Sequence, residues 1–293
     1  MDTDKPEIAE QDITENNSEK TTQKKADVSE KEMSFWDHVD ELRGVLVRAA
    51  IGVVAAMIVV FMNKNFVFDT LIFAPKSSDF IIYRWMCQLS EKLSIEALCP
   101  EAFNIDLINI ALSGQFFTHL STSFWLGLII AFPWVIYQLW RFVRPALYEN
   151  ERRHSTRAFF FCSFLFFLGI LVAYFIVFPL TVRFFATYQL SDAGYVPNQI
   201  SLTSYIGTFT TLTLSMGIVF EMPALLYILS KIGIVNKKFL RKYRRHAIVI
   251  IAILAAVITP TADPFTMTIV AVPILLLYEF SIWIVKGEKE QSN

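Results

Sequence analysis

Charged residues are scarce in this chain, and their scarcity narrows the class of protein more than any other feature. Asp, Glu, Lys and Arg make up 18% of its 293 residues, whereas a soluble protein is usually about a quarter charged. The charges also gather in a few segments and leave apolar stretches long enough to cross a bilayer. With 54% hydrophobic residues, 27 Phe and a mean hydropathy of +0.46, the composition excludes an ordinary soluble protein. It predicts an all-α, polytopic membrane protein.

Familiar catalytic motifs are missing as well. No Gly-x-x-x-x-Gly-Lys-Ser/Thr phosphate loop occurs, so the chain itself should not hydrolyse nucleotides. No His-Glu-x-x-His occurs, which removes the usual zinc-protease geometry, and the alternating polar residues of a transmembrane β-barrel are absent. We therefore expect a helical protein that is not an enzyme, holds no metal or other cofactor and binds no nucleic acid.

The first 33 residues lack any apolar run. They carry ten acids and five lysines, a composition that cannot bury enough apolar surface to fold, so we predict a disordered acidic tail at 1–33. Without an apolar central region this tail is no secretory signal, and its acidity argues against an organellar transit peptide. A bacterial or archaeal membrane is therefore expected rather than that of an imported organelle protein, and the bacterial cytoplasmic (inner) membrane is the location that we expect.

Six apolar runs lie in a membrane domain predicted for residues 34–286, and a short tail follows at 287–293. The runs lie near 45–62, 114–140, 156–185, 205–230, 246–258 and 267–285. Crossing the hydrocarbon core takes about 20 helical residues. The fifth run has only about 12 apolar residues and would be short for an unperturbed bilayer. The parity of the loops still requires it to cross, so we predict six helical spans.

Lysine and arginine in the loops predict the orientation of these spans. Five arginines lie in 141–157 and seven basic residues in 231–245, whereas 186–201 and 259–266 hold none. The loop 63–111 has four basic residues against six acids. Because positive loops remain in the cytoplasm, we expect both termini on the cytoplasmic side.

Two charged stretches border apolar runs on that predicted side. The first is His38-Val-Asp-Glu-Leu-Arg43, in which Glu41 lies four residues after Asp37 on the same helix face. The second runs from Arg144 to Arg153 and contains Glu149 and Glu151. Each has a plain structural explanation. The first could be the amphipathic start of a membrane helix, and the acids of the second could complement the dipole at the N-terminus of a helix. Either could also bind a cationic peptide at the membrane surface.

Glu221 is an ionisable residue inside the fourth run. It lies about ten residues from the inner end, roughly 15 Å deep. Such a group costs several kcal/mol near mid-bilayer and is a functional-site candidate by default. A protonated carboxyl, or one paired with a hydroxyl of a neighbouring helix, is the structural alternative, and the sequence favours neither.

These motifs together resemble signatures of the TatC family, the multispanning core subunits of the twin-arginine protein translocase. The resemblance covers about 34–286 and keeps the motifs in order. Its motifs are the stretches around Glu41 and Glu151, Ala74-Pro75, Phe178-Pro179, Phe220-Glu221-Met222-Pro223 and Thr259-Pro-Thr-Ala-Asp263-Pro264.

The resemblance implies a function and a set of site residues. Family members transport folded proteins without ATP, use the proton-motive force and recognise twin-arginine signal peptides at their cytoplasmic surface. By motif position, Glu41 and Glu151 are the receptor carboxylates. The other positions that it implies are Arg43, Phe142 and Tyr148 for signal-peptide recognition, Glu221 within the membrane, and Pro75 and Asp263 in the outer loops.

The resemblance also implies partners. TatA-like and TatB-like single-span subunits are expected to dock along the spans, span five included, within a receptor complex that holds several copies of the chain in the lipid membrane. The recognition is physically sensible, because a guanidinium offers a planar fork that suits a carboxylate bidentately and an ammonium does not. Two separate carboxylates would then demand two arginines at once.

Two alternatives come from other classes of protein. A secondary transporter of small solutes is typically built from internal repeats or from discontinuous helices around a site at the middle of the membrane. We find no convincing repeat between the two halves of this sequence. An intramembrane serine protease is weaker still, because Ser113 and His119 would point to different faces of one helix.

The chain has three cysteines. Cys87 and Cys99 lie in the long loop 63–111, predicted to face the outside, where disulfides can form, and Cys162 lies within span three. A disulfide between Cys87 and Cys99 would close a short loop and is feasible, although two free thiols are an equal alternative.

Overall fold

The computed structural model describes most of the chain after the N-terminal tail. The described residues are 35–94, 105–143, 149–189, 198–231, 233–261 and 263–285. The predicted tails at 1–33 and 287–293 lie outside them. The chain divides into two compact units, Met1–Leu46 and Val47–Asn293. In the first unit the described part is the start of helix α2, and all other elements belong to the second.

Five long apolar helices dominate the described residues, and each is long and apolar enough to cross a membrane. Within these five stretches, α5 continues through a π-helical segment, η5, into α6, and α7 is followed by α8. Their bounds are α2 (Phe35–Met62), α4 (Gly114–Val143), α5 (Glu149–Val172), η5 (Ala173–Val177), α6 (Phe178–Thr187), α7 (Leu202–Val219), α8 (Met222–Lys231) and α11 (Pro264–Ile284). The prediction of an all-α, polytopic fold is confirmed for the described part of the chain.

The fifth apolar run lies in α10 (Arg244–Ile258), which follows the short α9 (Lys237–Lys242). With 15 residues, α10 is about 22 Å long and falls short of the about 20 residues that a span normally needs. Asn236 begins α9 as its N-cap, because its side-chain oxygen accepts a hydrogen bond of 2.7 Å from the Phe239 N–H.

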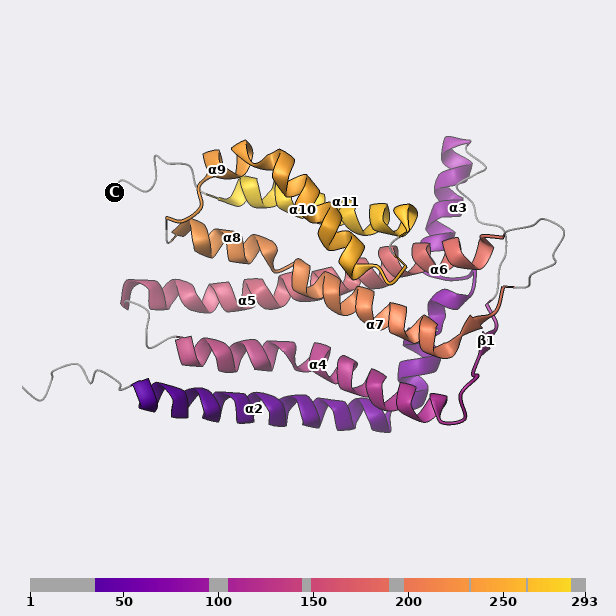
Figure 1. Cartoon of the computed structure of the whole chain (residues 1–293), viewed down its shortest axis with the longest axis horizontal. Helices are drawn as coiled ribbons and strands as arrows, with labels where there is room; N and C mark the ends of the chain where they lie inside the picture. The colour runs from indigo at the N-terminus through magenta and orange to yellow at the C-terminus, as the bar shows by residue number, and fades with distance from the viewer. Residues whose placement is uncertain are drawn as a thin grey trace, which may run out of the picture. The chain divides into compact units, whose positions relative to one another are not determined.

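The helices of the second unit pack in two connected groups (Figure 1). In one group α4, α5 and α7 contact one another, and in the other α11 contacts α8 and α10. Large side chains such as Phe178, Leu212 and Met216 are completely buried between them. Burial of this kind holds side chains to one arrangement, because protein interiors are close-packed.

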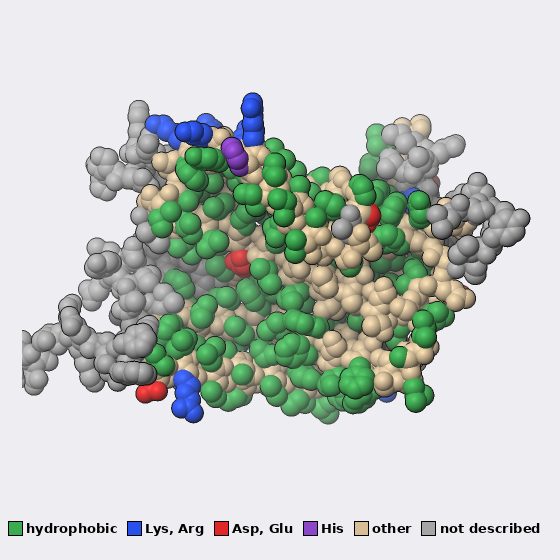
Figure 2. All heavy atoms as spheres, in the orientation of Figure 1, with side chains coloured by type: hydrophobic (Ala, Val, Ile, Leu, Met, Phe, Trp, Pro, Cys, Tyr) green, Lys and Arg blue, Asp and Glu red, His purple; other side chains and the backbone are tan. Residues whose placement is uncertain are grey.

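The two ends of this unit differ in chemistry. Lys and Arg side chains gather at the end where α9 and the start of α10 lie, while hydrophobic side chains cover the middle of the face in Figure 2. We call this the basic end. At the opposite end β1 (Leu107–Ile108) and β2 (Ile200–Ser201) form a two-residue parallel pair with Leu107 opposite Ile200, and we call it the β end.

Three short elements follow α2 at the β end. They are the π-helical η1 (Phe66–Ile72), the 3-10 turn η2 (Ala74–Lys76) and the helix α3 (Ile81–Leu93). Cys87 on α3 is disulfide-bonded and Cys162 on α5 is free. Cys99 lies outside the described residues, so its pairing with Cys87 stays a prediction.

Candidate functional site

Glu221 lies at a break between α7 and α8. Pro223 has no N–H to donate, which removes one helical hydrogen bond at this point. The backbone tightens instead, with the Glu221 N–H donating to the Ile218 carbonyl at 3.1 Å, and α8 restarts with the Leu225 N–H donating to the Glu221 carbonyl at 3.0 Å. The Phe-Glu-Met-Pro sequence thus places a carboxylate at an interruption inside a long apolar segment.

The Glu221 side chain is half-buried and faces α5. The thiol of Cys162 and the backbone N–H of Phe166 lie against its carboxylate. Its Oε1 atom is buried and has no hydrogen-bond partner among the described residues, and the same is true of the Ser163 hydroxyl oxygen. Buried polar atoms normally find partners, so this region has capacity to bind a water, a proton or a polar group.

Close packing of α5 against α7 fixes the position of the break. A Cβ added at Gly169 would lie 2.6 Å from the Met216 carbonyl oxygen, and one at Gly217 would lie 2.8 Å from the Phe166 ring. Phe166 in turn stacks on Phe132 of α4, with ring centroids 3.5 Å apart. Small residues let helices in membranes approach closely, and here they do so one turn before Glu221.

Replacing Gly217 by alanine is therefore expected to lower stability by about 1–3 kcal/mol, because the added methyl group overpacks the contact with Phe166. Gly207 on the same helix is the matched control, since a Cβ there meets nothing within 4 Å. Gly207→Ala should be neutral or stabilise by up to about 1 kcal/mol through helix propensity. Thermal unfolding of both variants in detergent measures the difference, and equal midpoints would contradict the packing argument.

Pro75 lies buried in η2 at the β end, in a segment that three tyrosine hydroxyls tie to the spans. The Tyr83 hydroxyl donates to the Pro179 carbonyl at 2.7 Å, the Tyr174 hydroxyl to Leu71 at 2.8 Å and the Tyr205 hydroxyl to Ile72 at 2.9 Å. Burial raises the pKa of the Tyr83 phenol far above its ordinary value, partly offset by Arg183, so it stays a donor. These bonds make the Pro75 segment a rigid part of the fold.

Asp263 begins α11 as its N-cap, followed by Pro264 at the first helical position. Its Oδ1 accepts from the Thr266 N–H at 2.8 Å, and its Oδ2 accepts from the Thr261 hydroxyl at 2.7 Å. Partial burial acts to raise the pKa of the carboxyl, but these hydrogen bonds outweigh it and lower the pKa below its usual value. The observed contacts assign Asp263 a capping role.

The predicted signal-peptide residues are described to different extents. Glu41 is partly buried and Arg43 exposed, both on the part of α2 that belongs to the first unit. Phe142 lies near the end of α4 in the second unit and is partly buried. The backbone of Glu151 lies in the first turn of α5, while its side chain and Tyr148 lie outside what the structure describes.

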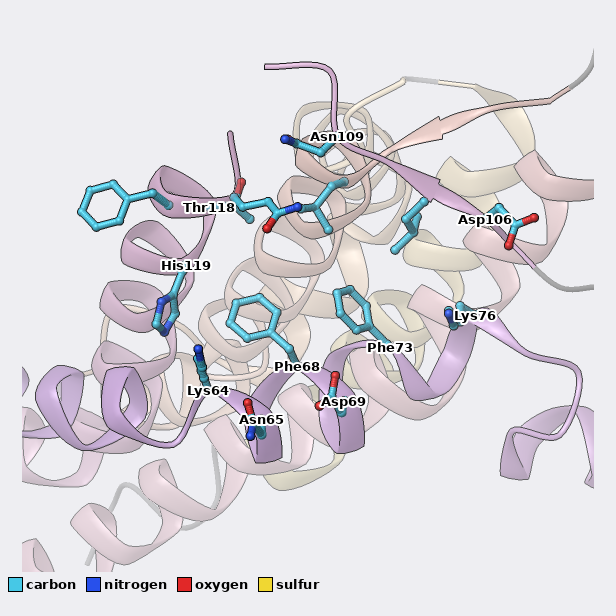
Figure 3. Close-up of a pocket in the computed structure, with 14 residues that line it drawn as sticks. Lys64, Asn65, Phe68, Asp69, Phe73, Lys76, Asp106, Asn109, Thr118 and His119 are labelled. Carbon is cyan, nitrogen blue, oxygen red and sulfur yellow. The ribbon is translucent and has the colours of Figure 1, made fainter. Parts of the chain in front are cut away.

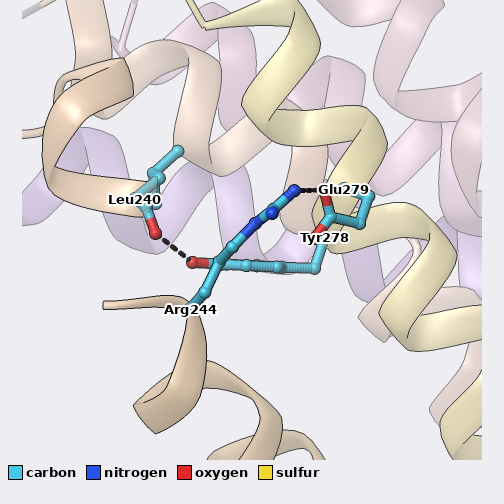
Figure 4. A network of polar contacts seen from close by, with 4 residues as sticks. All are labelled: Leu240, Arg244, Tyr278 and Glu279. Atoms are coloured by element: carbon cyan, nitrogen blue, oxygen red, sulfur yellow. Dashed lines mark hydrogen bonds and ion pairs between the residues drawn. The ribbon is translucent and has the colours of Figure 1, made fainter. Parts of the chain in front are cut away.

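An ion pair between Arg244 of α10 and Glu279 of α11 was not predicted from the sequence (Figure 4). Both side chains are about half exposed. Beside it, the Tyr278 hydroxyl donates to the Leu240 carbonyl at 2.9 Å and so ties α11 to α9. These contacts hold the short α10 in place at the basic end.

A cavity of about 790 Å³ opens at the β end and was also not predicted (Figure 3). Lys64, Asp69 and Lys76, from the segment after α2, and His119 of α4 line it, with Lys64 beside His119 and Lys76 farther along. His119 stacks on Phe61 with ring centroids 4.1 Å apart, and its Nε2 is buried without a partner among the described residues. The described residues contain no group of three His, Cys, Asp or Glu that could hold a metal ion.

Comparisons with known proteins agree across nearly the whole membrane region. A family model described as "Sec-independent protein translocase protein (TatC)" matches residues 37–273. A TatC from Blattabacterium sp. subsp. Periplaneta americana is 38% identical over 255 residues, which cover 86% of this chain and 95% of that protein. A TatC from Deinococcus radiodurans is 33% identical and the match covers 85% of this chain and 84% of that protein.

Solved structures give the same answer for the fold. A crystal structure described as "Twin Arginine Translocase Receptor- TatC in DDM" superimposes with a TM-score of 0.65 at 32% identity, covering 85% of this chain and 99% of that one. A second crystal structure of the twin-arginine translocase receptor TatC superimposes with a TM-score of 0.62, also at 32% identity.

Proposed function

Because the chain belongs to the TatC family of Sec-independent protein translocase proteins, we propose that it binds twin-arginine signal peptides and passes folded proteins across the bacterial cytoplasmic membrane. Members of this family are multi-pass membrane proteins of protein transport and not enzymes. The observation that carries the proposal is the family match over residues 37–273, which includes Glu41, Glu151, Glu221 and Asp263.

In the proposed orientation the basic end faces the cytoplasm and the β end faces outward. The supporting observation is the difference in charge between loops, with Lys and Arg concentrated around α9 and none in 186–201 or 259–266. Six crossings, with α10 as a short fifth, place both termini in the cytoplasm. The short α10 then crosses either by local thinning of the bilayer or in the shelter of α11.

Glu41 and Glu151 are the proposed receptor carboxylates. Each lies near the cytoplasmic start of a helix, Glu41 in α2 and Glu151 in the first turns of α5. In the sequence Arg43 lies two residues after Glu41, and three arginines follow Glu151 within six residues, so an isolated lysine would gain little there. A pair of guanidinium groups gains two bidentate contacts at once. Phe142 and Tyr148 are proposed to take part in signal-peptide recognition as well.

Glu221 is the proposed intramembrane group that couples transport to the proton-motive force. Its support is the Oε1 atom, which is buried at a break in the helix without a hydrogen-bond partner among the described residues. This oxygen could take up a proton or contact a passing segment. Pro75 and Asp263 are proposed to act indirectly, by holding the outer segments in shape through the contacts of Tyr83 and Thr266.

TatA-like and TatB-like single-span subunits are the proposed partners, within a complex that holds several copies of this chain. Support comes from the apolar side chains that α10 leaves uncovered although its other face packs on α11. More than half of the side chain is exposed at Ile248, Ile253 and Val257. An apolar single-span helix could pack along this face.

A binding measurement tests the proposed function. The purified protein in lipid vesicles is titrated with a labelled twin-arginine signal peptide and with its lysine-lysine counterpart. We expect saturable binding of the arginine peptide and weak binding of the lysine peptide, because an ammonium cannot form the planar fork. Equal binding of the two peptides, or none of either, would overturn the proposal and favour a small-solute transporter.

A further inference from the structure

The helix α3 carries one row of apolar side chains that no described part of the protein covers. Its members follow one another at four-residue intervals and are each about half exposed or more. They are Ile81 (51%), Trp85 (70%), Leu89 (49%) and Leu93 (54%). Residues four apart share a helix face, so they form a continuous stripe, which we call the α3 stripe.

Other faces of α3 are polar or packed on the protein. Tyr83 and Ser90 are buried, whereas Arg84 and Glu91, seven residues apart on a different face from the stripe, are exposed. The helix therefore has an apolar face, a charged face and a protein-facing edge. Such a division, with Trp and Leu on one side and charged residues on another, is typical of a helix that lies in the interface of a membrane.

The N-terminal end of α3 is fixed to the spans. The ring centroid of Phe80 lies 5.6 Å from that of Tyr174 and 5.9 Å from that of Phe175. The Tyr83 hydroxyl donates a hydrogen bond to the Pro179 carbonyl. Figure 1 shows α3 at the β end, running across the direction of α4, α5 and α7. A helix across the ends of membrane-spanning helices runs parallel to the membrane surface.

We propose that α3 lies in the outer membrane–water interface and buries the α3 stripe among lipid headgroups and the first acyl carbons. The occupant is lipid because the stripe continues the apolar surface of the spans. Ile176 of η5 is exposed and follows Phe175, on which Phe80 packs, and Ile81 follows Phe80. Trp85, the most exposed member, has the amphipathic ring that prefers this depth.

Collision measurements on spin labels test this proposal with the full-length protein in vesicles of phosphatidylethanolamine and phosphatidylglycerol. In a Cys162→Ser background, labels are attached without reductant at Trp85→Cys, Leu89→Cys and Glu91→Cys, so that the disulfide of Cys87 is retained. Ile58→Cys, an exposed position about one turn before the end of α2, provides the lipid reference. Collision rates with oxygen, which concentrates in lipid, and with a water-soluble nickel chelate are compared.

Labels at Trp85→Cys and Leu89→Cys should collide with oxygen more often than with the chelate, as the Ile58→Cys label does. At Glu91→Cys, on the charged face of the same helix, the order should reverse. Chelate collisions at both stripe positions equal to those at Glu91→Cys would place the stripe in water and overturn the proposal. Low collision rates with both reagents would overturn it in favour of a protein partner, a second copy of the chain included.

Discussion

Replacing either Glu41 or Glu151 by alanine is expected to weaken binding of a twin-arginine peptide by about 1.5–3 kcal/mol, the range for a hydrogen bond to a charged group. This corresponds to roughly a 10- to 150-fold rise in Kd. Because Glu41 is only partly buried, solvent screening should place its loss near the lower end of the range. Titration of labelled peptide into the detergent-solubilised protein measures both values.

The fork geometry makes the expected result more specific. A lysine-lysine peptide should bind the unchanged protein weakly and lose little more on either substitution. Cycles that pair each Glu change with each Arg change in the peptide should show one coupled pair per carboxylate. Binding should also weaken as salt is added, since screening acts most on exposed charges.

Asp40→Ala is the matched control for this experiment. Asp40 is an exposed carboxylate next to Glu41 on the same helix, so its loss changes the local charge by the same amount. We expect little change in affinity, because a neighbouring residue on a helix points elsewhere. If Asp40→Ala weakens binding as much as Glu41→Ala, the attraction is diffuse and the assignment of Glu41 as a receptor residue fails.

The long helices could be predicted from the sequence because each depends on local composition. The apolar runs at 114–140, 205–230 and 267–285 lie in helices of about the expected extent. The interruption before Pro223 also follows from a local property, the missing N–H of proline. The shortness of α10 was visible in the same way, as a run of too few apolar residues.

Contacts between distant segments could not be predicted in this way. The Tyr83 hydroxyl finds a backbone carbonyl 96 residues away at Pro179, and since every residue has a carbonyl, no sequence pattern marks the acceptor. The pair of Arg244 and Glu279 joins residues 35 apart, and only the packing of α10 on α11 brings them together. The role of Asp263 as an N-cap, by contrast, agrees with its position directly before Pro264.

Glu221→Gln is expected to abolish most transport while leaving folding and membrane insertion intact. A glutamine has nearly the same size and keeps hydrogen-bonding groups, but it neither carries charge nor exchanges a proton. Since Oε1 of Glu221 is buried without a partner among the described residues, a neutral amide should be easier to bury than a carboxylate. Stability should therefore stay the same or rise while transport falls.

Glu279→Gln supplies the control for the Glu221 experiment, because it changes the same chemical group on another apolar helix. Glu279 is about half exposed and pairs with Arg244, so its loss should cost no more than about 1 kcal/mol of stability and leave most transport intact.

Export of a folded twin-arginine substrate from cells and the thermal midpoint of the purified variants are measured side by side. Normal export by Glu221→Gln would show that this carboxylate only fills space, whereas a loss of export together with a lower midpoint would assign it a structural role. If Glu221→Gln lowers export while its thermal midpoint stays the same or rises, the charge or the proton of this carboxyl is used during transport.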